Sequence, residues 1–203
     1  MARSPPPRAR NAREPKCFQE EKEKVTHSTD WELPEYLQAV FAENSNLDAV
    51  FAALMPALCQ AWRCDRCFLY LRNPQTGQGR ITHCWGTSPE WADLSGSDWL
   101  EEGDIASKDP LMAIAFRTAE PVFVEDIETA GPEIVNLDYE RDVFQHRALI
   151  HAPLYHEGLM YGILEPCVFQ QPRVWTEGDR RITTEIQDRL VPLAAAYVRQ
   201  QGT

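Results

Sequence analysis

The spacing of apolar residues changes from a helical period to a two-residue period near position 66, and this change most limits the possible folds. Before it, apolar residues recur every three or four positions over 33–41 and again over 47–62. After it, residues 67–71 and 81–85 predict two strands joined by a turn that contains Pro and Gly. Strands adjacent in sequence imply an antiparallel sheet with its helices on one face, which is an α+β fold.

The remaining elements extend this arrangement into one domain. A polar stretch over 86–110 precedes a short helix and a short strand over 122–124. A second hairpin turns at Glu157-Gly158, and Thr176 caps a last helix, with Asp179 completing a weak capping box. We expect the five strands in the order 2-1-5-4-3, with the first and last helices packed on one face. The loops then cover the other face and enclose a pocket suited to a small molecule.

Charge and composition restrict the function classes. The 203 residues carry a formal net charge of −11, and cations concentrate in a Pro- and Arg-rich segment over 1–29, which we expect to be a disordered tail. An acidic body repels nucleic acid, so none is expected as a partner. Six cysteines without a readable export signal favour free thiols in a cytoplasmic protein. No apolar run approaches the roughly 20 residues of a transmembrane helix.

The domain boundaries follow from where the apolar periodicity starts. We expect a leading helix over 30–45 and the main domain over 46–199. A lone helix of that length is marginal in water, so its apolar stripe must be buried on its own domain or on a second copy. Leu193, Tyr197 and Val198 on the last helix offer a further apolar surface. The two surfaces together predict a homodimer.

Three segments of the chain resemble GAF domains. Residues 47–71 (LDAVFAALMPALCQAWRCDRCFLYL) resemble the helix, turn and first strand that open these domains. Residues 109–127 (DPLMAIAFRTAEPVFVEDI) resemble their middle helix and strand. Residues 146–175 (HRALIHAPLYHEGLMYGILEPCVFQQPRVW) resemble the terminal hairpin, above all that of cyanobacteriochromes and phytochromes. The resemblance implies a GAF-like sheet, a ligand pocket and a part in signal transduction.

Two positions depart from the bilin-binding members of that family. Asn136 stands where the chromophore-attaching cysteine falls, and residues 125–166 contain no cysteine. Cys167 stands where those domains carry a histidine that contacts the bilin. Because no thioether can form without a thiol, we expect a phytochrome-like domain without covalent bilin, whose cofactor is unknown.

The last strand of the second hairpin supplies the clearest pocket residues. Side chains alternate between the two faces of a strand, so Tyr161, Glu165 and Cys167 are expected on the pocket face. A buried carboxylate is costly unless it is paired, and either a ligand cation or a structural partner such as Arg147 or His151 would satisfy Glu165. The candidate pocket residues are Trp85, Trp91, Asn136, His151, Tyr161, Glu165 and Cys167.

The cysteines support a second hypothesis. Cys64 and Cys67 form a C-x-x-C pair, which is typical of redox pairs and of half zinc sites. In the expected strand order, Cys84 and Cys167 lie on the strands that flank the strand of Cys67. A thiol cluster or metal site is one interpretation, and small apolar thiols that fill the core are the more common one.

No motif for nucleophilic, zinc-protease or phosphoryl-transfer chemistry is present in the sequence. We therefore expect a non-catalytic, stand-alone sensory or regulatory domain that binds a small ligand or a protein partner. One alternative is a redox-active or metal-binding protein that uses Cys64, Cys67, Cys84 and Cys167. Another is an adaptor in a photosynthetic, cyanobacterial context.

Overall fold

The computed structural model describes residues 31–44, 46–91 and 93–201. The chain divides into two units, Met1–Glu32 and Leu33–Thr203, and all elements named below belong to the second. The expected disordered tail over 1–29 lies outside the described residues.

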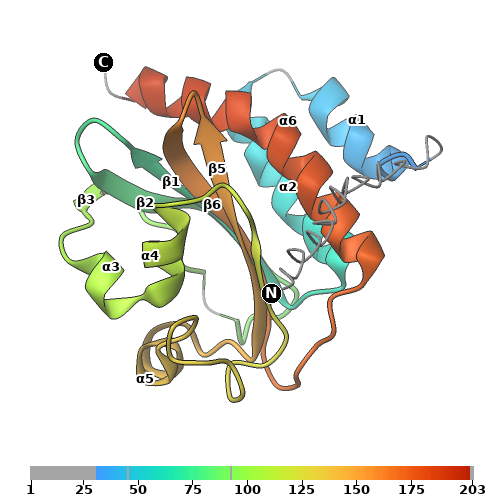
Figure 1. Ribbon diagram of the computed structural model, residues 1–203. Helices are drawn as coiled ribbons and strands as arrows, with labels where there is room; N and C mark the ends of the chain where they lie inside the picture. Colours follow the sequence, from blue (N-terminus) through green and yellow to red (C-terminus); the bar gives the residue numbers. More distant parts are fainter. Residues whose placement is uncertain (1–30, 45, 92, 202–203) are drawn as a thin grey trace, which may run out of the picture. The chain divides into compact units, whose positions relative to one another are not determined.

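A six-stranded antiparallel sheet forms the centre of this second unit, in the order β3-β2-β1-β6-β5-β4 (Figure 1). The α+β class and the expected order of five strands are confirmed. The edge strand β3 was not expected, because its two residues are exposed and too few to show an alternating pattern. The strands are β1 (Arg66–Asn73), β2 (Gln78–Gly86), β3 (Leu100–Glu101), β4 (Val122–Val124), β5 (Ala148–His156) and β6 (Leu159–Val168).

Three helices lie on one face of the sheet (Figure 1): α1 (Glu35–Glu43), α2 (Leu47–Trp62) and α6 (Glu177–Gln201). The two longer helices, α2 and α6, both begin with side-chain caps. The Asn46 side chain accepts a hydrogen bond from the Ala49 amide, and Thr176 and Asp179 each accept from the other's amide. Among the described residues, no helix has both the length and the apolar content needed to cross a bilayer.

The other face of the sheet is covered by short elements (Figure 1). These are α3 (Ile105–Lys108), α4 (Pro110–Ala115), α5 (Leu137–Tyr139) and a π-helical turn, η1 (Glu140–Phe144). Asp109 caps α4 through a hydrogen bond from the Leu111 amide at 2.9 Å, and proline at the first position suits the start of a helix. The polar stretch over 86–110 therefore contains both a strand and a helix.

The apolar stripes of α1 and α6 pack in part against the rest of the same chain. Leu37 on α1 is fully buried, and the Arg189 guanidinium of α6 lies 5.6 Å from the ring of Phe41. Tyr197 and Val198, which the sequence placed on an exposed surface, are buried too. The chain's own packing thus covers part of these surfaces, Tyr36 on α1 remains 39% exposed, and the dimer stays a prediction.

A β-bulge interrupts the alternation of side chains along β6. The register between β5 and β6 shifts between Leu154 and Tyr155, which leaves Tyr161 without a partner residue. Tyr161 therefore turns toward the helices, where its ring lies 5.8 Å from the Arg199 guanidinium of α6. The expectation that Tyr161 faces the pocket is wrong, because a bulge shifts the alternation by one residue.

Gly162, next to the bulge, is required by the neighbouring strand. A Cβ atom at this position would lie 2.3 Å from the Tyr70 carbonyl oxygen of β1.

Candidate functional site

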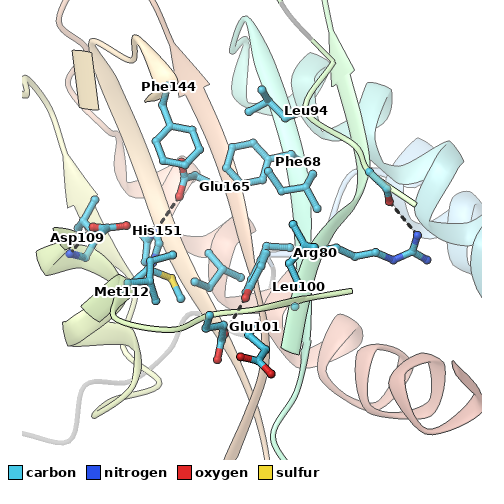
Figure 2. A pocket seen from close by; sticks show the side chains of 18 of the residues that line it. Phe68, Arg80, Leu94, Leu100, Glu101, Asp109, Met112, Phe144, His151 and Glu165 are labelled. Atoms are coloured by element: carbon cyan, nitrogen blue, oxygen red, sulfur yellow. Dashed lines mark hydrogen bonds and ion pairs between the residues drawn. The ribbon is translucent and has the colours of Figure 1, made fainter. Parts of the chain in front are cut away.

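A cavity of about 330 Å³ lies on the sheet face opposite α2 and α6, beneath α3, α4 and η1 (Figure 2). Its volume is at the lower end of the range for small-molecule sites. Its apolar walls include Phe68, Ile81, Leu111, Met112, Phe144 and Ile163. Its acidic, basic and imidazole side chains are Arg80, Asp98, Glu101, Glu102, Asp109, Glu140, His151 and Glu165.

The centre of the polar lining is a hydrogen bond between neighbouring strands. His151 on β5 and Glu165 on β6 point toward each other (Figure 2), with 2.6 Å between Nδ1 and Oε2. Both side chains are almost fully buried. Burial alone would raise the pKa of Glu165, but the hydrogen bond from His151 and the charge of Arg66 outweigh it and lower the pKa below its ordinary value. Glu165 is therefore a carboxylate that accepts the Nδ1 proton of His151.

The second ring nitrogen of His151 is unpaired within the described part of the chain. Nε2 is buried and has no hydrogen-bond partner among the described residues, although His151 borders the cavity. With its proton on Nδ1, the neutral ring presents a lone pair at Nε2. A buried acceptor without a partner costs free energy, so a group that donates to Nε2 is favoured here.

Asp109 contributes a carboxyl group that titrates near neutral pH. Its pKa is raised to about 6, chiefly by burial and in addition by the charges of the nearby carboxylates Glu165 and Glu140. One oxygen caps α4, as described above, and the side chain also lines the cavity. Asp109 and His151 thus present adjoining acceptors to the same space.

A second buried network of polar side chains contacts Glu165 through His146. Nη2 of Arg66 lies 3.0 Å from Nε2 of His146, whose Nδ1 lies 3.2 Å from Glu140 and 3.4 Å from Glu165. A guanidinium can only donate, so Nε2 of His146 accepts and its proton is on Nδ1, facing the two carboxylates. The carboxylates would favour an imidazolium at this position, but its Nε2 proton would then point at the guanidinium, and we assign the neutral ring.

Glu102 attaches the edge of the cavity to the sheet. Arg72 donates two hydrogen bonds to its carboxylate, at 2.8 and 2.7 Å, and the Tyr70 hydroxyl donates a third at 2.7 Å. Such a bidentate pair is among the stronger polar contacts in proteins. Because Glu102 follows β3 directly, this contact holds the segment that carries β3 and α3 beside the cavity.

The structure brings together only two of the seven candidate pocket residues, His151 and Glu165. Trp91 instead stacks on Phe169, with 4.1 Å between ring centres, in a separate surface hollow. Asn136 is exposed, caps α5 and donates a hydrogen bond to the Lys108 carbonyl.

The other three candidates also lie away from the cavity. Trp85 borders a groove beside α2, Tyr161 faces α6, and Cys167 belongs to a separate apolar cluster. Cys167 was expected to line the pocket because it shares a face with Glu165. Its sulfur is instead fully buried near the Arg66 carbonyl.

The four cysteines of the thiol hypothesis do not meet. Cys84 pairs in register with Phe68, a cavity residue, whereas Cys67 pairs with Trp85, so these two thiols lie on opposite faces of the sheet. Cys64 precedes β1 and contacts Cys59. No group of three or more metal-binding side chains was found in the described part of the chain. Burial raises the pKa of Cys84 to about 11 and that of Cys67 well above its ordinary value.

Asp109, Glu140 and Glu102 are cavity residues that the sequence did not reveal. The Asp-Pro pair at 109–110 indicates the start of a helix and gives no sign that Asp109 also lines a cavity. Glu140 and Glu102 lie in irregular segments, where no periodicity tells which side chains point inward. These three residues could be found from the sequence only by a rule that buried acids gather beside the histidine of the second hairpin.

Fold and cavity together define a class of protein: an antiparallel sheet with terminal helices on one face and a small-molecule cavity on the other. The family model for the GAF domain matches residues 46–191, and the chain belongs to the GAF domain family. The resemblance seen in three sequence segments is therefore confirmed. A search of curated proteins gave no match.

Solved GAF structures share the fold at low sequence identity. The GAF domain of an Acinetobacter phosphoenolpyruvate-protein phosphotransferase has a TM-score of 0.61 at 15% identity, covering 83% of this chain and 96% of its own. The photoproduct state of GAF3 from Slr1393 of Synechocystis gives 0.58 at 24%, covering 77% and 96%. Free methionine-R-sulfoxide reductase from Neisseria meningitidis, in complex with its substrate, gives 0.58 at 17%, covering 84% and 89%.

Proposed function

We propose that this GAF domain is a non-catalytic sensory or regulatory module that binds a small ligand in the cavity beside His151. The observation that carries the proposal is the buried Nε2 of His151, which borders the cavity without a partner among the described residues. A bound donor would remove the cost of that unpaired atom. The volume of about 330 Å³ suits a ligand of one or two rings rather than a large one.

The chemistry of the lining favours a ligand that is cationic or rich in N–H groups. Asp109 and Nε2 of His151 both accept hydrogen bonds when Asp109 is ionised, and Glu140 and Glu165 add negative charge behind them. The surrounding walls are apolar, which strengthens electrostatic attraction by excluding water. An amine carried on an aromatic or aliphatic ring meets both requirements.

The composition of the lining supports binding without catalysis. None of the described residues that border the cavity is Ser, Thr or Cys, the side chains that a His–carboxylate pair commonly activates as nucleophiles. Some structural neighbours are enzymes, such as the Neisseria reductase, whose fold this chain shares. A signal from the cavity would leave through β3 and α3, which Glu102 connects to the sheet.

A thermal-shift screen with matched pairs of compounds tests this proposal. Each pair has one ring and one chain length but ends in an amine or a carboxylate, for example phenethylamine and phenylpropionate. We expect amines to raise the melting temperature at pH 7.5 in proportion to the logarithm of concentration, and acids to have no effect. Asp109→Asn, which keeps the helix cap, should abolish the shift, whereas Asp188→Asn on the exposed side of α6 should not. Equal shifts by acids, or no shift by any amine, would contradict the proposal.

A further inference from the structure

The helix side of the sheet holds a pair of thiols that the cavity does not involve. The sulfur atoms of Cys59 and Cys64 lie 3.5 Å apart, which is close to van der Waals contact. The Cys64 amide also donates a hydrogen bond to the Cys59 carbonyl at 3.1 Å, so the two main chains are held together as well. A disulfide bond is about 2.05 Å long, and closing the gap requires the sulfurs to approach by roughly 1.5 Å.

The end of α2 creates this juxtaposition. Cys59 lies in the last turn of the helix, and Arg63 then adopts a left-handed conformation with φ of 50°. That conformation folds the chain back, which brings the fifth residue onward beside Cys59. The Arg63 carbonyl accepts a hydrogen bond from Arg173 at 2.9 Å, and this contact fixes the turn to the segment before α6. The spacing of the two thiols is therefore set by the fold.

Both thiols border an open groove. The groove has a volume of about 800 Å³ and runs between α1, α2 and the end of β2. Two aromatic side chains along it, Tyr36 and Trp85, remain 39% and 40% exposed. Although each cysteine is itself nearly buried, a small molecule in the groove would reach their surroundings without crossing the core.

We propose that Cys59 and Cys64 form a reversible disulfide when a peroxide oxidises the protein. The Cys59 thiolate attacks one oxygen of hydrogen peroxide, the O–O bond breaks, and hydroxide leaves a sulfenic acid on Cys59. The Cys64 sulfur then attacks the Cys59 sulfur, the S–O bond breaks, and the hydroxyl departs as water with the Cys64 proton. In total, two thiols and one peroxide give one disulfide and two water molecules.

The hydrogen bond between the thiols assigns the order of attack. The Cys64 S–H donates to the Cys59 sulfur, which lowers the pKa of Cys59 against the stronger combined effect of burial and neighbouring thiols. Burial raises the pKa of Cys64 well above its ordinary value. Both thiolates are scarce at pH 7, so the reaction is slow there, and its rate should rise about tenfold per pH unit below the thiol pKa.

Peptide mapping of the full chain tests the pairing directly. Trypsin cleaves after Arg63 and after Arg66, so Cys64 is isolated in the tripeptide CDR, while Cys59 lies in the peptide over 25–63 and Cys67 in the peptide over 67–72. We expect hydrogen peroxide at pH 8 to remove two titratable thiols and to link CDR to the peptide over 25–63. Dithiothreitol should reverse both changes.

Three substitutions complete the experiment. Cys59→Ser and Cys64→Ser should each abolish the link, while Cys84→Ser, on the cavity face of the sheet, should leave it unchanged. The proposal is overturned if CDR is linked to the peptide of Cys67, if the link joins two chains, or if all six thiols remain after the oxidant has been consumed. Because mapping of the unmodified chain alone identifies the pair, a variant that fails to fold does not remove the test.

Discussion

At the residue scale, Asp109 serves both the fold and the candidate site. One oxygen caps α4, and the same carboxyl group lines the cavity close to Glu140, His151 and Glu165. The cap could be predicted, because Asp before Pro at a helix start is a local pattern. The cavity role could not, because it depends on acids that are distant in sequence and close in space.

The pH dependence of stability should reveal the raised pKa of Asp109. Its folded pKa of about 6 exceeds the unfolded value near 3.9, so the folded state binds more protons between about pH 4 and 6. Stability from this group is present at low pH and is lost as pH rises through 6. Relative to Asp109→Asn, the wild type should lose up to about 3 kcal/mol of unfolding free energy between pH 4 and 7.5. Urea unfolding at several pH values measures this, and parallel curves would refute the raised pKa.

Asn136 predicts the absence of a covalent chromophore. It is exposed, caps α5 and lacks a thiol, so no thioether can form at the position where bilin-binding relatives attach their chromophore. When the protein is produced together with bilin synthesis, its band on a denaturing gel should show no zinc-induced fluorescence. A fluorescent band would mean that another side chain forms the bond.

At the element scale, strand alternation predicted Glu165 correctly and Tyr161 incorrectly. Glu165 faces the cavity as period two requires, and it pairs with His151, one of the two partners expected. The bulge moved Tyr161 to the helix face, and bulges leave little trace in an apolar pattern because both faces of β6 are buried. Both caps of the main helices were readable, since they depend only on neighbouring residues.

Packing of α1 within its own chain makes Leu37 a stability determinant. It is fully buried, so Leu37→Ala should cost about 2–5 kcal/mol of unfolding free energy through lost contacts and a residual cavity. Glu43→Ala, exposed at the end of the same helix, should change it by less than about 0.5 kcal/mol. Light scattering should give the same mass for the wild type, Leu37→Ala and Glu43→Ala. A mass halved only by Leu37→Ala would place the stripe at a subunit interface instead.

At the scale of the whole molecule, the two faces of one sheet hold two separate chemistries. The cavity face carries acids and His151, and the helix face carries Cys59 and Cys64 beside an open groove. The order of five strands could be predicted because each of these five was visible in the sequence and the family pattern is shared. The lining of the cavity could not, because η1, β3 and α3 are short and irregular. Cys59 was overlooked because its spacing matches a core stripe of α2.

The position of a bound amine tests the central claim most directly. A crystal soaked with the amine that gives the largest thermal shift should show its nitrogen within hydrogen-bond distance of Asp109 or of Nε2 of His151, with its ring among the apolar walls near Phe68 and Met112. An amine found only in the groove beside Cys59, or a cavity that stays without ligand at saturating concentration, would contradict the account.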